Sequence, residues 1–207
     1  MRLRRAWAVV PSKAFSRGKS RLASILPPGS RASLSRALLG HVLGVLGRCP
    51  LDGVLVLADG AEVAALANRH GAVALRDPGP EPLGALVDAG LAAVAARGAS
   101  SALVLMSDLP RLVPHDVLEL LDLVDRCDVA VAPDRHGAGT GALALCPPAG
   151  LRTCFGHGDS FRRHLLAAQR AGLRSAVYCS PGVAFDVDSP EDHELEVAAG
   201  SKAVALA

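Results

Sequence analysis

Ala102-Leu-Val-Leu-Met-Ser-Asp-Leu-Pro110 is an apolar run that ends in a serine, an aspartate and a proline. A short unbroken run of this kind is typical of a strand buried on both faces in a parallel sheet. Open α/β sheets bind ligands beyond the carboxyl ends of their strands, so Asp108 is expected at such an edge, with its carboxylate free to hold a cation. Turn formation before Pro110 would explain the aspartate equally well. The choice between the two depends on which other residues reach the same edge.

Runs of strand length alternate with amphipathic stretches of helix length along the whole chain. Strands are predicted at residues 6–10, where Pro11 would stop the first, and at 54–58, 72–75, 102–108, 129–132, 142–146 and 175–178. Helices are predicted from the N-cap Ser30 to Pro50, over 62–70, 83–97 and 115–126, from the N-cap Ser160 to 171, and after Ser189. This alternation predicts one α/β domain over residues 1–207, with a mostly parallel sheet between helices. A local antiparallel pair is expected at 129–146, and residues 200–207 are expected to fray.

The composition limits the class of protein. Half of the 207 residues are apolar but only 3% are aromatic, so the core must consist of alanine, leucine and valine. The net charge of +2 conceals a first segment of 36 residues with nine basic and no acidic side chains. Such a segment suits a polyanion. One tryptophan, one tyrosine and no RNA-binding signature favour the phosphates of a small molecule over nucleic acid.

The cysteines and apolar runs indicate the compartment. Five cysteines without C-x-x-C spacing form neither a disulfide framework nor a zinc site, and they fit a reducing cytosol. The apolar run 6–10 is too short for a signal peptide, and no stretch reaches the roughly 18 residues of a membrane span. We therefore expect a cytoplasmic protein without a membrane partner. The oligomeric state, monomer or homo-oligomer, stays open.

A basic loop, Lys13-Ala-Phe-Ser-Arg-Gly-Lys-Ser-Arg21, follows the first predicted strand. Gly18-Lys19-Ser20 resembles the end of a P-loop, but that motif needs a glycine where Lys13 stands. The sequence thus argues against a P-loop ATPase. Either a different phosphate-binding loop or a plain solvated basic loop is compatible with these residues.

Two further aspartates form a second acidic group near the end of the chain. Asp186 and Asp188 are two residues apart in a stretch that we predict to be a strand, so both would face one side and either could meet Asp108. Carboxylates at such an edge suit Mg²⁺, completed by water and substrate phosphates. Alternatively, one of the pair only supports the turn before the last helix.

Two glycine-bearing loops are candidates for ligand contact. Residues 134–140 lie between two predicted strands, where glycines let backbone N–H groups approach a ligand, although a plain hairpin connection has the same composition. Residues 155–160 lead into a helix N-terminus, which binds anions through its free N–H groups. There Ser160 could equally be only a cap. The histidines at 41, 70, 115 and 193 match no ligand spacing and are interpreted as structural or surface residues.

Taken together, these segments resemble one family, the phosphoenolpyruvate or 2-phospho-L-lactate guanylyltransferases of deazaflavin coenzyme F-420 biosynthesis. The matching segments, in order, are Val10-Pro-Ser-Lys13, Gly18-Lys-Ser-Arg-Leu22, Ser107-Asp-Leu-Pro110, Pro133-Asp-Arg-His-Gly137 with Gly139-Thr140, Phe155-Gly156 with Ser160-Phe161 and His164, and Asp186-Val-Asp-Ser-Pro-Glu-Asp192. The resemblance covers nearly the whole chain. It implies a single-domain nucleotidyltransferase fold, glycosyltransferase-A-like and Rossmann-like. It also implies transfer of GMP from GTP to a phosphorylated three-carbon acid, with release of pyrophosphate.

The resemblance also implies roles for individual residues. Asp108 with Asp188 or Asp186 would hold Mg²⁺, and the triphosphate would be bound by Lys13, Lys19 and Arg21. The acid substrate would be bound by Thr140, Gly156, Gly158 and Ser160. By the same analogy, catalysis would rest on Lys13, Lys19, Arg21 and Asp108.

The sequence departs from the family pattern at three places. Gly141 stands where the family usually has asparagine, Gly84 replaces the asparagine of a Gly-Leu-Asn motif, and Gly156 and Ser160 are one residue further apart than is common. These departures concern the selectivity for nucleotide or acid more than the reaction class. Two alternatives stay open: another nucleotidyltransferase of this fold, acting on a sugar phosphate or a molybdopterin-type cofactor, or a non-catalytic nucleotide-binding module.

Overall fold

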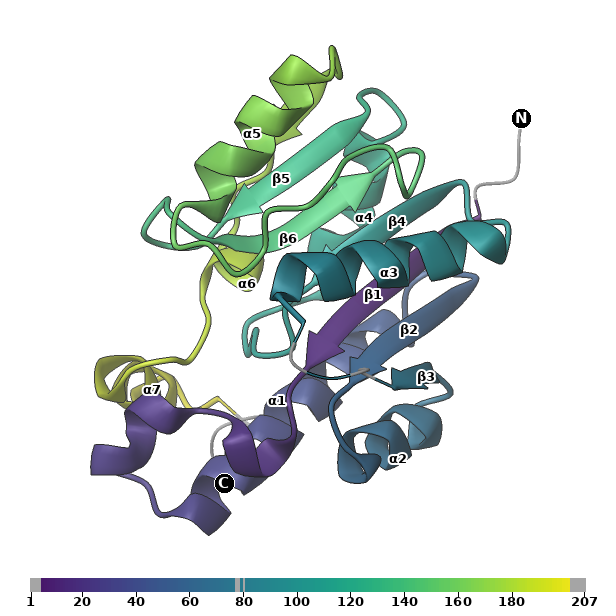
Figure 1. The fold of residues 1–207 in the computed structure, drawn as a ribbon. Coiled ribbons are helices and arrows are strands. Elements are labelled where there is room, and N and C mark those ends of the chain that lie inside the picture. Colours follow the sequence, from purple (N-terminus) through teal and green to yellow (C-terminus); the bar gives the residue numbers. More distant parts are fainter. Residues whose placement is uncertain (1–4, 77–78, 80, 202–207) are drawn as a thin grey trace.

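The computed structural model describes residues 5–76, 79 and 81–201, and these are built around one seven-stranded sheet of order β3-β2-β1-β4-β6-β5-β7 (Figure 1). The strands are β1 (Ala6–Ser12), β2 (Gly53–Ala58), β3 (Val73–Arg76), β4 (Ser101–Leu105), β5 (Val129–Pro133), β6 (Thr140–Leu145) and β7 (Ser175–Val177). Strand β6 is antiparallel to β4 and β5, and the other pairs are parallel. The mostly parallel sheet and its antiparallel excursion are therefore confirmed.

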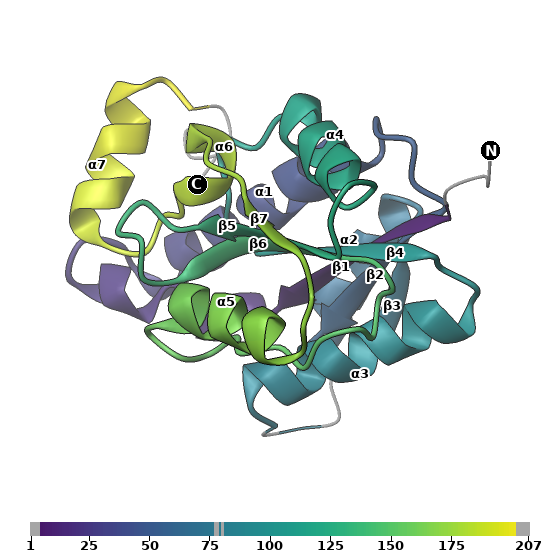
Figure 2. The same ribbon diagram turned by 90° about the horizontal axis from the view of Figure 1, so that it is seen from above.

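Helices cover both faces of the sheet, as Figure 2 shows. One face carries α1 (Pro28–Leu46), α2 (Ala61–Arg69) and α4 (Pro114–Leu123), and the other carries α3 (Leu83–Ala96) and α5 (Ser160–Arg170). The 3₁₀ helices η1 (Phe15–Arg17) and η2 (Ser20–Ser24) follow β1, and α6 (Pro181–Ala184) and α7 (Pro190–Ala198) come last. The apolar run of β4 is unbroken because both faces of this strand are buried. Leu103 and Leu105 enter one core, and Ala102 and Val104 enter the other.

Several predicted element ends are wrong. Strand β1 continues through Pro11 to Ser12. Its pairing with β4 ends at Val9, so Pro11 has only β2 beside it, and such a position tolerates a proline. Helix α1 begins at Pro28 after Pro27, and Ser30 lies inside the helix, because the fixed φ of proline suits a first helical turn.

The N-caps predicted for α5 and α7 have opposite outcomes. Ser160 is not an N-cap: it is the first residue of α5, after Asp159, and its hydroxyl donates to Thr140 instead. Ser189 does cap α7, since its Oγ accepts from the Asp192 N–H at 3.3 Å while the Asp192 carboxylate accepts from the Ser189 N–H at 2.7 Å. These reciprocal bonds form the capping box that the sequence signature indicates.

Residues 185–188 belong to no strand, so the strand predicted there is wrong. The alternation of apolar and acidic residues in this segment still has a structural reason. Phe185 and Val187 are buried with three leucines of η2 and α1 in a small separate core. This packing leaves Asp186 and Asp188 outside that core, where they meet Asp108.

Two further predictions concern the C-terminal tail and membrane-spanning segments. Most of the tail expected to fray, residues 202–207, lies outside the described residues. Within the described part of the chain, no helix combines the length and the apolar character that crossing a bilayer requires.

Candidate functional site

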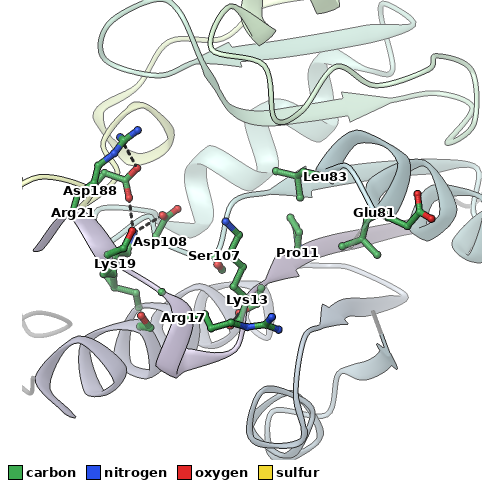
Figure 3. A pocket seen from close by; sticks show the side chains of 16 residues that line it. Pro11, Lys13, Arg17, Lys19, Arg21, Glu81, Leu83, Ser107, Asp108 and Asp188 are labelled. Atoms are coloured by element: carbon green, nitrogen blue, oxygen red, sulfur yellow. Dashed lines mark hydrogen bonds and ion pairs between the residues drawn. The ribbon is translucent and has the colours of Figure 1, made fainter. Parts of the chain in front are cut away.

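A cavity of about 510 Å³ lies beyond the carboxyl ends of β1 and β4 (Figure 3). Its walls come from the segment after β1, the residues after β4 and the start of α3. The basic side chains of Lys13, Arg17, Lys19 and Arg21 line it together with Asp108 and Asp188. This volume is that of a small-molecule site, and the basic lining suits an anionic ligand.

Three carboxylates meet at one end of this cavity. One oxygen each of Asp108, Asp186 and Asp188 lies within 4.8 Å of the others. Burial, and then the charges of Asp108 and Asp188, raises the pKa of Asp186 to about 6. Like charges held this close are stabilised when a cation binds between them.

The ammonium group of Lys19 lies against this cluster, as the dashed lines of Figure 3 show. Its Nζ is 2.5 Å from Asp108 Oδ2 and 3.1 Å from Asp188 Oδ1, and the side chain is only 7% exposed. Burial alone would lower the pKa of Lys19, but the two carboxylates outweigh burial and raise the pKa. A charged Lys19 and three ionised aspartates leave the cluster with two net negative charges.

The backbone at Gly18 and Lys19 brings this ammonium to the carboxylates. Lys19 has φ of +54°, the one positive φ of a non-glycine residue in the described ranges. This conformation costs a lysine about 1–2 kcal/mol, and the two ion pairs offset it. Gly18 leaves room for Ser35 of α1, because a Cβ at position 18 would lie 2.6 Å from Ser35 Oγ and would displace that hydroxyl.

The other predicted phosphate ligands lie around the same cavity. Lys13 is exposed in its wall, and Arg21 Nη1 is 3.6 Å from Asp188 Oδ2.

Arg17 pairs with Asp59, whose Oδ2 also accepts from the Ala14 N–H at 3.2 Å. The sequence interpretation missed Asp59, although it follows β2 just as Asp108 follows β4. The position after a buried strand was the available signal.

Two of the predicted acid-binding residues form a buried polar network. The Ser160 hydroxyl donates to Thr140 Oγ1 at 3.1 Å, and His164 Nδ1 lies 3.0 Å from the same oxygen. His164 Nε2 accepts from the Cys154 N–H at 2.8 Å, which assigns the ring proton to Nδ1. Burial lowers the pKa of His164 to about 4, so the ring is neutral. Thr140 Oγ1 therefore accepts from both neighbours and keeps its own proton to donate to a ligand.

Of the four predicted acid-binding residues, only Thr140 shares a cavity with a carboxylate of the cluster. Thr140 and Asp186 line a neighbouring cavity of about 70 Å³. Gly156, with φ of +91°, packs against Leu83 in the wall of the large cavity. Gly158 has open space around it and lines neither cavity. Substrate binding by Thr140, Gly156, Gly158 and Ser160 stays a prediction.

Close packing explains both glycines that depart from the family pattern. A Cβ on Gly141 would lie 1.8 Å from the Val183 carbonyl oxygen, and one on Gly84 would lie 3.2 Å from the carbonyl oxygens of Thr153 and Phe155. Helix α6 therefore rests directly on β6. An asparagine at position 141 would require α6, and with it the approach to Asp186, to move.

Gly141→Ala tests this packing. We expect it to lower the free energy of unfolding by about 1–3 kcal/mol, the usual cost of overpacking a tight contact. Chemical denaturation measures the change, with Gly44→Ala as the control on the exposed side of α1, where a Cβ meets open space. That control should gain up to about 1 kcal/mol from helix propensity. Equal stability of Gly141→Ala and the unmodified protein would show that α6 does not require glycine there.

The sequence of the chain is similar to those of known proteins. The family model described as "Guanylyl transferase CofC like" matches residues 6–204. A phosphoenolpyruvate guanylyltransferase of Rubrobacter xylanophilus is 41% identical over 94% of this chain and 95% of its own, and one of Sphaerobacter thermophilus is 39% identical over 90% of both. A 2-phospho-L-lactate guanylyltransferase of Methanothermobacter thermautotrophicus is 34% identical over 89% of this chain and 81% of its own.

Solved structures show the same fold at lower sequence identity. A putative nucleotide-diphospho-sugar transferase of Desulfovibrio desulfuricans superposes with a TM-score of 0.79 and 18% identity, covering 99% of this chain and 94% of its own. A nucleotidyl transferase from Methanothermobacter gives a TM-score of 0.68, also at 18% identity, over 93% of this chain and 95% of its own. The expected nucleotidyltransferase fold is therefore confirmed.

Proposed function

The chain belongs to the guanylyl transferase CofC-like family, and we propose that it transfers GMP from GTP to phosphoenolpyruvate or 2-phospho-L-lactate and releases pyrophosphate. In coenzyme F-420 biosynthesis this step activates the three-carbon acid. The observation that supports it best is the meeting of Asp108, Asp186, Asp188 and Lys19 at one end of a basic cavity of about 510 Å³. An acidic cluster beside basic side chains is what a triphosphate with its cation requires.

The donor set fits Mg²⁺. Asp108, Asp186 and Asp188 would hold it, because they offer hard carboxylate oxygens within 4.8 Å of one another and keep a net negative charge beside Lys19. When bound, Mg²⁺ would supply positive charge to the oxygens of the reacting phosphates.

The protein's own side chains would bind and orient the substrates. Lys13, Lys19 and Arg21 line the cavity and would pair with triphosphate oxygens, which also stabilises the departing pyrophosphate. The attacking phosphate oxygen of the acid is already anionic, so no side chain needs to remove a proton. In-line positioning and charge neutralisation would therefore provide the rate.

Thr140 is the residue best arranged to contact the acid substrate. Its hydroxyl proton is free to donate, and Thr140→Val removes that donor while keeping the side-chain shape. We expect the KM for the acid to rise about tenfold, the equivalent of one lost hydrogen bond to a charged group, with little change for GTP. Thr153→Val is the matched control, because Thr153 is similarly buried and donates to the Gly84 carbonyl instead. Equal losses for acid and GTP would contradict the assignment.

The raised pKa of Asp186 predicts a pH dependence. Because that pKa is about 6, the carboxyl is ionised and able to bind a cation above pH 6, and it becomes protonated below. The affinity for Mn²⁺, used as a probe, should fall by up to about tenfold per pH unit below that point. Titrations across this range measure it, and Asp186→Asn should abolish this part of the dependence. A flat profile in the unmodified protein would refute the role of Asp186.

A panel of nucleotides and acceptors tests the proposed reaction. The protein is incubated with Mg²⁺, with GTP, ATP or CTP, and with phosphoenolpyruvate, 2-phospho-L-lactate or a sugar phosphate. Pyrophosphate release and ³¹P spectra of the products are then followed. We expect turnover with GTP and a three-carbon acid. Turnover only with a sugar phosphate would favour the rival transferase, and nucleotide binding without turnover on any acceptor would favour a binding module.

A further inference from the structure

We propose that Arg111 and Arg135 are positioning residues that hold the carboxylates of Asp186 and Asp188 close to that of Asp108. The inference rests on the proposed function, since it takes these three aspartates as the cation site. Neither arginine lines the cavities described above. Both act through the segment that connects α6 to α7.

Helix α7 carries two buried carboxylates that require partners. Asp192 is 2% exposed and Glu196 is 1% exposed. They are four residues apart, so they lie on the same face of the helix. Arg135 Nη2 donates to Asp192 Oδ1, and Arg111 Nε donates to Glu196 Oε1 at 2.5 Å. Buried carboxylates are strongly destabilising without such partners, so the two arginines fix where α7 docks.

The same contacts reach the backbone of Asp188. The other carboxylate oxygen of Asp192 accepts from the N–H groups of Asp188 at 2.9 Å and Ser189 at 2.7 Å. Arg135 also holds the other end of this segment, because its backbone N–H donates to the Ala184 carbonyl at 2.8 Å. Residues 184–189 are thus anchored on both sides of the two aspartates.

Phe185 brings the two arginines together between these anchors. The Arg111 guanidinium lies 3.8 Å from the centre of the Phe185 ring, and the Arg135 guanidinium lies 5.0 Å from it. Arg111 is three residues after Asp108 in the same loop. One contact cluster therefore joins the loop that carries Asp108 to the segment that carries the other two aspartates.

The arrangement of α7 shows why such a cluster is needed. Figure 1 shows α7 beyond the carboxyl end of β1, beside the segment that follows this strand. Outside the sheet, no ladder of backbone hydrogen bonds can set the position of Asp188. The arginines also pair with Asp192 and Glu196, so the charge of these two carboxylates is compensated apart from the Asp108, Asp186 and Asp188 cluster.

Mn²⁺ binding to the full chain, followed by electron paramagnetic resonance, tests the proposal. Arg135→Met should raise the Mn²⁺ Kd about tenfold or more, the usual effect of removing a residue that orients metal ligands. The control Arg174→Met breaks an exposed pair with Asp128, before the opposite end of β5, and should leave the Kd unchanged. An unchanged Kd in Arg135→Met would overturn this inference alone. Absence of Mn²⁺ binding by the unmodified protein would overturn the cation site and the inference with it.

A double variant separates positioning from general stability. Arg135→Met/Asp192→Asn leaves no unpaired buried carboxylate, so its unfolding midpoint should return toward that of the unmodified protein. Its Mn²⁺ Kd should stay raised, because the link that Arg135 makes between Asp192 and Phe185 is still missing and Arg111 alone joins α7 to that ring. A Kd that recovers together with the midpoint would show that Arg135 acts only on stability and would overturn the proposal.

Discussion

Asp108→Asn is expected to lower kcat/KM at least about 1000-fold while the protein stays folded. A bound cation contributes several kcal/mol of transition-state stabilisation, and about 4 kcal/mol corresponds to three orders of magnitude in rate. The substitution keeps the shape of the side chain and removes the charge that faces both Asp186 and Lys19. The side chain is 21% exposed, so the amide finds solvent and the fold is kept.

Steady-state pyrophosphate release and circular dichroism measure this effect. Asp128→Asn is the matched control, because that carboxylate precedes β5, at the end of the strand opposite the site, and pairs with Arg174. It should retain full activity. An Asp108→Asn enzyme within tenfold of the unmodified rate would refute the assigned role.

Lys19→Met should have the second largest effect, on both activity and stability. Removal of the ammonium leaves three carboxylates without their internal cation, and breaking a buried ion pair costs about 3–5 kcal/mol. The cost should be at the low end, because Asp188 is 44% exposed. Turnover should fall at least about 100-fold, since a charge that pairs with the triphosphate is also lost.

The response to a cation distinguishes this role of Lys19 from a general loss of stability. Unfolding is measured with chelator and with Mn²⁺. Mn²⁺ should stabilise Lys19→Met more than the unmodified protein, because only the variant lacks a positive charge in the cluster. Lys13→Met is the control: Lys13 is exposed in the same cavity, so activity should fall while the gain from Mn²⁺ stays normal. The same gain in all three proteins would show that Lys19 does not compensate the charge of the carboxylates.

The sequence predicted the parts of the fold that depend on local pattern. The apolar run at 102–106 indicated a doubly buried strand, because no polar residue interrupts it, and the structure buries every residue of β4. The position of Asp108 followed from that strand. Asp186 and Asp188 were predicted to share a side for a wrong reason, since it is the burial of Phe185 and Val187, and not a strand, that makes the segment alternate.

Contacts between distant segments could not be predicted from the sequence. Lys19 pairs with carboxylates 89 and 169 residues away, and the basic loop by itself indicated only phosphate binding. Helix α6 has four residues, too few to show a helical period. Its packing on Gly141 depends on a backbone contact, for which no sequence pattern exists.

Anomalous diffraction from crystals of the protein grown with Mn²⁺ and GTP tests the cation site most directly. We expect a manganese peak coordinated by Asp108, Asp186 and Asp188, with the triphosphate beside Lys13, Lys19 and Arg21. A triphosphate bound in the cavity without a peak at these carboxylates, or a peak held by other residues, would contradict this expectation.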